Sequence, residues 1–113
     1  MAVNDEFAGY VLSQMGDLED VTLKKMFGGG GIYSRGRIFG LVVGAVLYLK
    51  VDDTNRHLFE EKGMKPFKPF EDRPMVMSYF EVPADVIEDP ELLQEWSRRS
   101  LEVSARAKGK RRF

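Results

Sequence analysis

The chain has 113 residues, of which 43% are hydrophobic and 31% charged, and this composition is typical of one globular domain. It contains no cysteine, which excludes disulfides, thiolate metal sites and cysteine nucleophiles. Because the net charge is only -1, overall charge does not steer the molecule toward nucleic acid. The first residues lack a signal-peptide pattern, and no apolar run approaches the roughly 20 residues that span a bilayer. We therefore expect a cytoplasmic protein without a membrane anchor.

The first predicted element is a short helix that begins after Asn4, a residue type that caps helix N-termini well. Phe7, Val11 and Met15 recur at four-residue spacing, which indicates one apolar stripe along that helix. Gly16 is a residue at which the helix can end.

Short segments rich in β-branched and aromatic residues follow, with glycines between them. They comprise residues 21–27, 32–34, 37–43 and 46–51. Such spacing predicts an antiparallel meander with hairpin tips at Arg35-Gly36 and Gly44-Ala45. The run Gly28–Gly31 is interpreted as a turn or bulge between strands.

Both faces of this predicted sheet are partly apolar. Alternation along residues 37–43 places Phe39, Leu41 and Val43 on one face, and Ile38 and Val42 on the other. Helices on both sides, or a partner on one side, would cover these faces. The same pattern permits a homodimer without requiring one.

The second half of the chain alternates helix and strand signals. A helix is predicted from Asp52 or Asp53 to about Lys62, ended by Gly63, and a fifth strand over residues 75–82. Asp89-Pro90-Glu91 has the cap, proline and acid of a helix start. The expected apolar stripe of this last helix consists of Leu92, Leu93, Trp96, Ser100, Val103 and Ala107.

Together these elements predict an α+β fold: an antiparallel meander sheet of about five strands with flanking N-terminal, middle and C-terminal helices. Residues 1–107 form one domain, and residues 108–113 form a basic C-terminal tail.

No pattern of catalytic or metal-ligating residues stands out. The glycine run has no following lysine as in a phosphate-binding P-loop, and His57 is the only histidine. The acids around Asp89 are explained by helix N-termini. We therefore predict no catalytic, metal or cofactor-binding residue. A small-ligand site at the glycine turn is kept as an alternative.

Two basic segments are candidate contact surfaces for a protein partner or for nucleic acid. The first mixes rings and cations, as single-stranded nucleic-acid binders do, and comprises Lys65, Phe67, Lys68, Phe70 and Arg73. The second is the basic C-terminal end, with Arg106, Lys108, Lys110, Arg111 and Arg112. Core packing and solvated charge are the alternative explanations.

Ordered strings along the chain resemble the N-terminal domain of the TfoX (Sxy) family. They include Lys24-Lys-Met-Phe-Gly-Gly29, Gly31-Ile-Tyr33, Phe39-Gly-Leu-Val42, Leu47-Tyr-Leu-Lys-Val-Asp52, Met77-Ser-Tyr79 and Glu81-Val-Pro83. The resemblance implies an antiparallel sheet flanked by helices. It also implies a non-enzymatic role in switching on DNA-uptake (competence) genes, with the transcription machinery or the cyclic-AMP receptor protein as partner.

Overall fold

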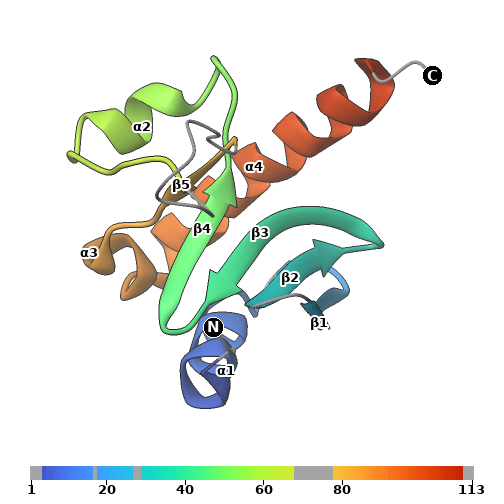
Figure 1. The fold of residues 1–113 in the computed structure, drawn as a ribbon, viewed down its shortest axis with the longest axis vertical. Helices are drawn as coiled ribbons and strands as arrows, with labels where there is room; N and C mark the ends of the chain where they lie inside the picture. Colours follow the sequence, from blue (N-terminus) through green and yellow to red (C-terminus); the bar gives the residue numbers. More distant parts are fainter. Residues whose placement is uncertain (1–3, 17, 27–28, 68–77, 111–113) are drawn as a thin grey trace, which may run out of the picture.

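The computed structural model describes residues 4–16, 18–26, 29–67 and 78–110. In chain order its elements are α1 (Asp5–Gln14), β1 (Val21–Met26), β2 (Gly29–Ser34), β3 (Arg37–Val43), β4 (Val46–Lys50), α2 (Arg56–Glu60), β5 (Tyr79–Glu81), α3 (Ala84–Ile87) and α4 (Pro90–Lys110). The five strands form one sheet in the order β1-β2-β3-β4-β5, and all neighbours are antiparallel. This architecture confirms the predicted α+β meander (Figure 1).

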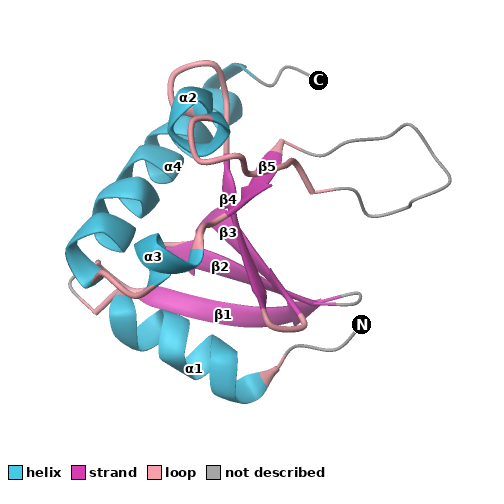
Figure 2. Cartoon of the chain, turned by 90° about the vertical axis from the view of Figure 1, so that its left-hand side faces the viewer, coloured by secondary structure: helices cyan, strands magenta, loops and turns pink. Residues whose placement is uncertain are grey.

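The helices lie mainly on one side of the sheet. Figure 2 shows α1, α3 and α4 together on that side, while α2 lies beyond the end of β4. No helix in the described ranges crosses the opposite face of the sheet. Helices on both sides, the first of the two predicted coverings, are thus not seen in the described part of the chain, and a partner on the open face stays a prediction. Among these helices, none is both long enough and apolar enough to span a membrane.

The predicted caps of the first and last helices are confirmed. The Asn4 side-chain oxygen accepts a hydrogen bond from the Phe7 amide at 3.0 Å. The Asp89 carboxylate accepts from the amides of Glu91 and Leu92 at 3.1 and 3.2 Å. Because these bonds satisfy amides that have no partner within the helix, they set the starts of α1 and α4.

The middle helix is shorter than the sequence predicts. Its start at Asp52 or Asp53 is wrong, since α2 begins at Arg56 and ends at Glu60. The Asp52 carboxylate instead accepts hydrogen bonds from the amide and hydroxyl of Thr54, at 2.8 and 2.6 Å. Such a local side-chain turn competes with helix formation, so residues 52–55 form a turn. Gly63 has a φ of +74°, consistent with its predicted role after the helix.

Gly29, Gly30 and Gly31 belong to a strand. The interpretation of the glycine run as a turn is therefore wrong for these three residues. These three residues belong to β2 and are paired with β1, and Gly30 and Gly31 are also paired with β3. A Cβ on Gly29 would come within 2.6 Å of the Val42 carbonyl oxygen, so only glycine fits between the strands there. Residues 27 and 28 lie outside the described residues. The small-ligand site at this turn stays a prediction.

A β-bulge changes which side chains of β3 reach the core. The register between β2 and β3 shifts after Ile32, and Phe39 is left as the extra residue. Phe39 and Val42 are consequently both fully buried, although simple alternation places them on opposite faces. The predicted grouping of Phe39 with Leu41 and Val43 is therefore wrong, and those two side chains are half-buried.

The buried stripe of α4 is rotated slightly from the predicted one. Its buried members are Leu93, Gln94, Trp96, Ser97, Ser100, Val103 and Ser104. Leu92 is 40% exposed, so its assignment to the stripe is wrong, while the Ala107 side chain lies outside the described residues. Serines on this stripe allow the helix to approach the sheet closely. Ser100, for example, donates to the Lys50 carbonyl at 2.8 Å.

Three rings join α4, α2 and the sheet at the centre of the core. The ring centroids of Phe59 and Trp96 are 4.7 Å apart in an edge-on arrangement, and those of Phe59 and Phe80 are 5.8 Å apart. Phe59 is fully buried and Trp96 is 5% exposed. Because each ring comes from a different element, their contact holds the two helices against β5.

Replacing Trp96 with alanine is expected to lower the free energy of unfolding by about 3–5 kcal/mol, because it leaves a cavity between α4 and Phe59. Urea denaturation followed by circular dichroism measures the loss. Leu92→Ala, on the exposed side of the same helix, is the matched control and should cost less than about 1 kcal/mol. Equal losses in the two variants would contradict the assignment of Trp96 to the core.

Candidate functional site: the aromatic face of the sheet

Aromatic and lysine side chains gather on the face of the sheet opposite α4. On β4, Tyr48 and Lys50 alternate with Leu47 and Leu49, which are fully buried beneath the helices. Because side chains alternate along a strand, Tyr48 and Lys50 point away from that core. We call this surface the aromatic face and define it by Lys24, Tyr33, Tyr48, Lys50, Phe67 and Tyr79.

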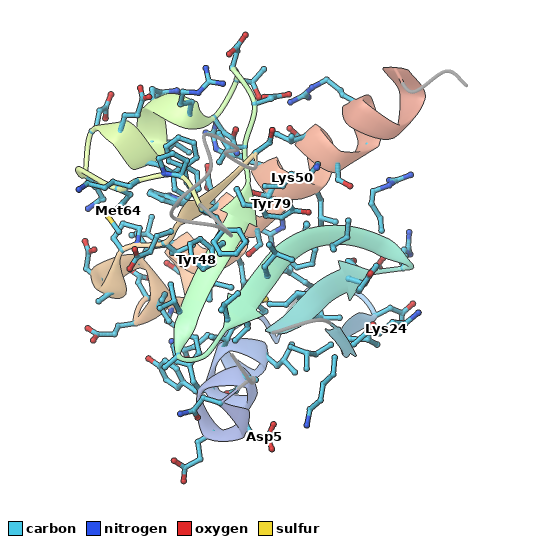
Figure 3. The ribbon with its side chains drawn as sticks, in the orientation of Figure 1. Asp5, Lys24, Tyr48, Lys50, Met64 and Tyr79 are labelled. Atoms are coloured by element: carbon cyan, nitrogen blue, oxygen red, sulfur yellow. The ribbon has the colours of Figure 1, made fainter. Side chains whose placement is uncertain are left out.

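Each lysine of the aromatic face lies over a tyrosine ring. Lys50 is directly opposite Tyr79 in the β4–β5 register, and its ammonium nitrogen is 5.0 Å from the centre of that ring. The Lys24 ammonium lies 5.3 Å from the Tyr33 ring on the same face, on the strands β1 and β2 at the opposite edge of the sheet. Figure 3 shows Tyr48, Lys50 and Tyr79 close together over β4 and β5. Each cation–ring pair stabilises the surface by about 0.5–1 kcal/mol.

The segment before the undescribed residues 68–77 extends the sheet beside β5. The Phe67 amide donates to the Tyr79 carbonyl at 2.7 Å, and the Glu81 amide donates to the Lys65 carbonyl at 3.1 Å. The Phe67 ring packs on Tyr48 with centroids 4.6 Å apart. The structure thus brings Phe67 from the predicted basic–aromatic segment onto the aromatic face, whereas Lys65 is an exposed side chain at the sheet edge.

The remaining predicted contact residues are not brought to this face by the described part of the chain. Lys68, Phe70, Arg73, Arg111 and Arg112 lie outside the described residues, as do the side chains of Lys108 and Lys110. The backbone of α4 itself continues to Lys110, into the segment that the sequence assigns to the tail. For these residues the contact role stays a prediction.

Arg106 takes part in an intramolecular network. Its guanidinium lies 3.3 Å from the Asp52 carboxylate and donates to the Thr54 hydroxyl at 2.7 Å. Desolvation by itself raises the pKa of Asp52, but the hydrogen bonds from Thr54 and Arg106 outweigh it and hold that pKa below its ordinary value. Arg106 therefore joins the C-terminal half of α4 to the turn that precedes α2.

Burial raises the pKa of two phenols of the aromatic face. Desolvation, with a smaller contribution from Tyr33, raises the pKa of Tyr79 to about 12. Desolvation, followed by the negative charge of Glu81, also raises the pKa of Tyr48. At physiological pH both groups are therefore neutral hydrogen-bonding groups on flat apolar rings, next to two cationic lysines. This combination suits binding by stacking and hydrogen bonding.

The described residues offer no comparable arrangement for metal chemistry. Within them, no group of three or more histidine and acidic side chains converges to hold an ion. His57 is exposed on α2, and Asp85 is paired with Lys62 at 2.8 Å. The Lys62 ammonium donates to Asp85 and lowers the pKa of that carboxyl.

Five members of the aromatic face were not among the predicted contact residues: Lys24, Tyr33, Tyr48, Lys50 and Tyr79. The available signal was the alternation in residues 46–51, where Tyr48 and Lys50 are interleaved with leucines. Tyr33 and Lys24 come from different strands, and only the β1–β2 register brings them together. The pairing therefore had no signal within either segment alone.

The fold defines a small α+β domain, in which a meander sheet is covered by helices on one side. The sequence matches the TfoX N-terminal domain over residues 13–104, which is most of the chain, and the protein belongs to that family. The family is regulatory, related to competence, and is not a known enzyme family. No individual curated protein shows a significant match.

Replacing Tyr79 with phenylalanine is expected to reduce the loss of stability at alkaline pH. The folded state raises the pKa of this phenol from about 10 to about 12 and so binds its proton more tightly than the unfolded chain does. The resulting stabilisation is complete below about pH 10 and is lost as the pH rises toward about 12. Urea unfolding at a series of pH values up to about 11 should show a shallower decline for Tyr79→Phe than for wild type. Parallel declines would contradict the burial of this hydroxyl.

Proposed function

We propose that this protein is a non-enzymatic regulatory module that binds a protein of the transcription machinery in the control of DNA uptake. The cyclic-AMP receptor protein and RNA polymerase are the candidate partners. The observation that carries this proposal is membership of the TfoX N-terminal family over residues 13–104. Action in the cytoplasm is part of the same proposal.

The aromatic face supports a contact function. Tyrosine and other aromatic residues are enriched at the centres of protein interfaces because they bury large apolar area at low entropic cost. Tyr48 and Tyr33 are only half-buried, so their rings keep accessible surface. The lysines beside them supply charge at the rim, where it favours association with a partner of opposite sign.

Removal of the central ring should weaken partner binding without unfolding the domain. In a binding assay with purified cyclic-AMP receptor protein and RNA polymerase, Tyr48→Ala is expected to bind at least about tenfold more weakly than wild type. Tyr10→Ala is the matched control, since Tyr10 is a 43% exposed tyrosine on α1. Absence of binding to both purified partners, or equal weakening by the two variants, would count against the proposal.

A second candidate function is the binding of single-stranded nucleic acid on the same face. The observation that favours it is the pairing of lysines with rings at Lys24–Tyr33 and Lys50–Tyr79. Single-strand binders combine stacking rings with cations that contact phosphates. The basic residues at the end of α4 would add to the positive charge.

Salt dependence separates this candidate from protein binding. If phosphate contacts drive association, the affinity for a single-stranded oligonucleotide should fall steeply between low and physiological salt. Lys50→Gln should reduce both the affinity and the slope of that salt dependence, as expected when one phosphate contact is lost. An affinity independent of salt, or no binding at low salt, would reject nucleic-acid binding.

A further inference from the structure

A second surface feature lies on the helix side of the sheet, at the tip of the β2–β3 hairpin. It is a cleft of about 560 Å³, and its lining residues come from three parts of the chain that are distant in sequence. They are Leu18, Glu19, Ser34, Arg35, Arg37, Arg98 and Leu101. Figure 1 shows the hairpin tip at the right-hand end of the sheet. We call this feature the arginine cleft.

The hairpin wall of the cleft is held in place by hydrogen bonds. The Ser34 hydroxyl donates to the Glu19 carbonyl at 2.6 Å, and the Arg35 amide donates to the Asp20 carbonyl at 3.4 Å. Arg35 has a φ of +54° and is followed by Gly36 at +78°. Hairpin turns of this type favour Asn, Asp or Gly at the first of these positions, so arginine is an uncommon choice there. The turn therefore presents a guanidinium at some conformational cost.

The charge on the arginine cleft is only partly compensated. Arg35 pairs with Glu19, whereas Arg37 and Arg98 form no ion pair within the described part of the chain. Glu102 lines a neighbouring hollow on the other side of Arg98. Two guanidiniums on separate elements are thus available in a protein whose net charge is -1. Guanidinium groups bind carboxylates and phosphates through paired N–H donors.

The rest of the lining favours carboxylates over nucleotides. Leu18 and Leu101 are half-buried side chains that pack against the core and give the cleft an aliphatic wall. None of the lining residues has a ring on which a base could stack. No helix N-terminus supplies amides for a phosphate either, since α4 enters the lining only at Arg98 and Leu101, well past its start at Pro90.

We propose that the arginine cleft binds an acidic peptide segment of a protein partner. Two carboxylates of the segment pair with Arg37 and Arg98, and an aliphatic side chain between them packs on Leu18 and Leu101. The inference rests on the proposed function in taking a protein as the partner, but it uses none of the residues of the aromatic face.

The test selects peptides from a random display library on the immobilised wild-type protein. The peptides that bind should be enriched in Asp and Glu next to Leu, Ile or Val. A selected peptide is then titrated against Arg37→Gln/Arg98→Gln, which should bind it at least about tenfold more weakly. The charge-matched control is Arg56→Gln/Arg99→Gln, which removes two arginines outside the cleft and should stay within about twofold of wild type.

Three results would overturn the proposal: selected peptides without acidic enrichment, equal loss of binding in both double variants, or displacement of the peptide by inorganic phosphate at equal concentration. The last result would indicate a general anion site. Because the selection uses no native partner, its result is independent of the assay with purified transcription proteins. A failed peptide selection with intact partner binding would refute the cleft alone.

Discussion

The packing of α4 against the sheet is the interaction on which the rest of the structure depends. Trp96 reaches the centre of the core, where Phe59 joins it to Phe80 of the short strand β5. Neither the five-residue α2 nor the three-residue β5 is long enough to be stable alone. Their positions therefore follow from the ring contacts with α4, and so does the placement of Phe67 and Tyr79 beside β4.

One-sided packing has a direct consequence for function. The helices α1, α3 and α4 gather on one face of the sheet (Figure 2). Because side chains alternate along a strand, those that point away from the core line a second surface. A sheet face of this kind is ordinarily polar when it meets water. Here Tyr48 and Phe67 pack together on it, and lysines lie above Tyr33 and Tyr79. Aromatic rings, rather than only polar side chains, therefore line the face opposite α4.

The sequence predicts local features well and features that depend on strand pairing poorly. The Asn4 and Asp89 caps and the Arg35-Gly36 and Gly44-Ala45 tips were predictable because their chemistry lies within a few residues. The bulge at Phe39 has no such local signal, since it arises from the register between β2 and β3. The requirement for glycine at position 29 of β2 likewise comes from the Val42 carbonyl of the neighbouring chain segment, which is distant in sequence.

The same distinction governs how much of the candidate sites was predictable. Phe67 was identified because rings and lysines are adjacent in its own segment, whereas the Lys24–Tyr33 pair exists only through strand register. The arginine cleft is further removed from local signals, because Arg37 and Arg98 meet only when α4 packs across the hairpin. Packing of α4 thus forms the cleft on the helix side and leaves the aromatic face on the other. Since these surfaces share no residue, contacts at one need not displace contacts at the other.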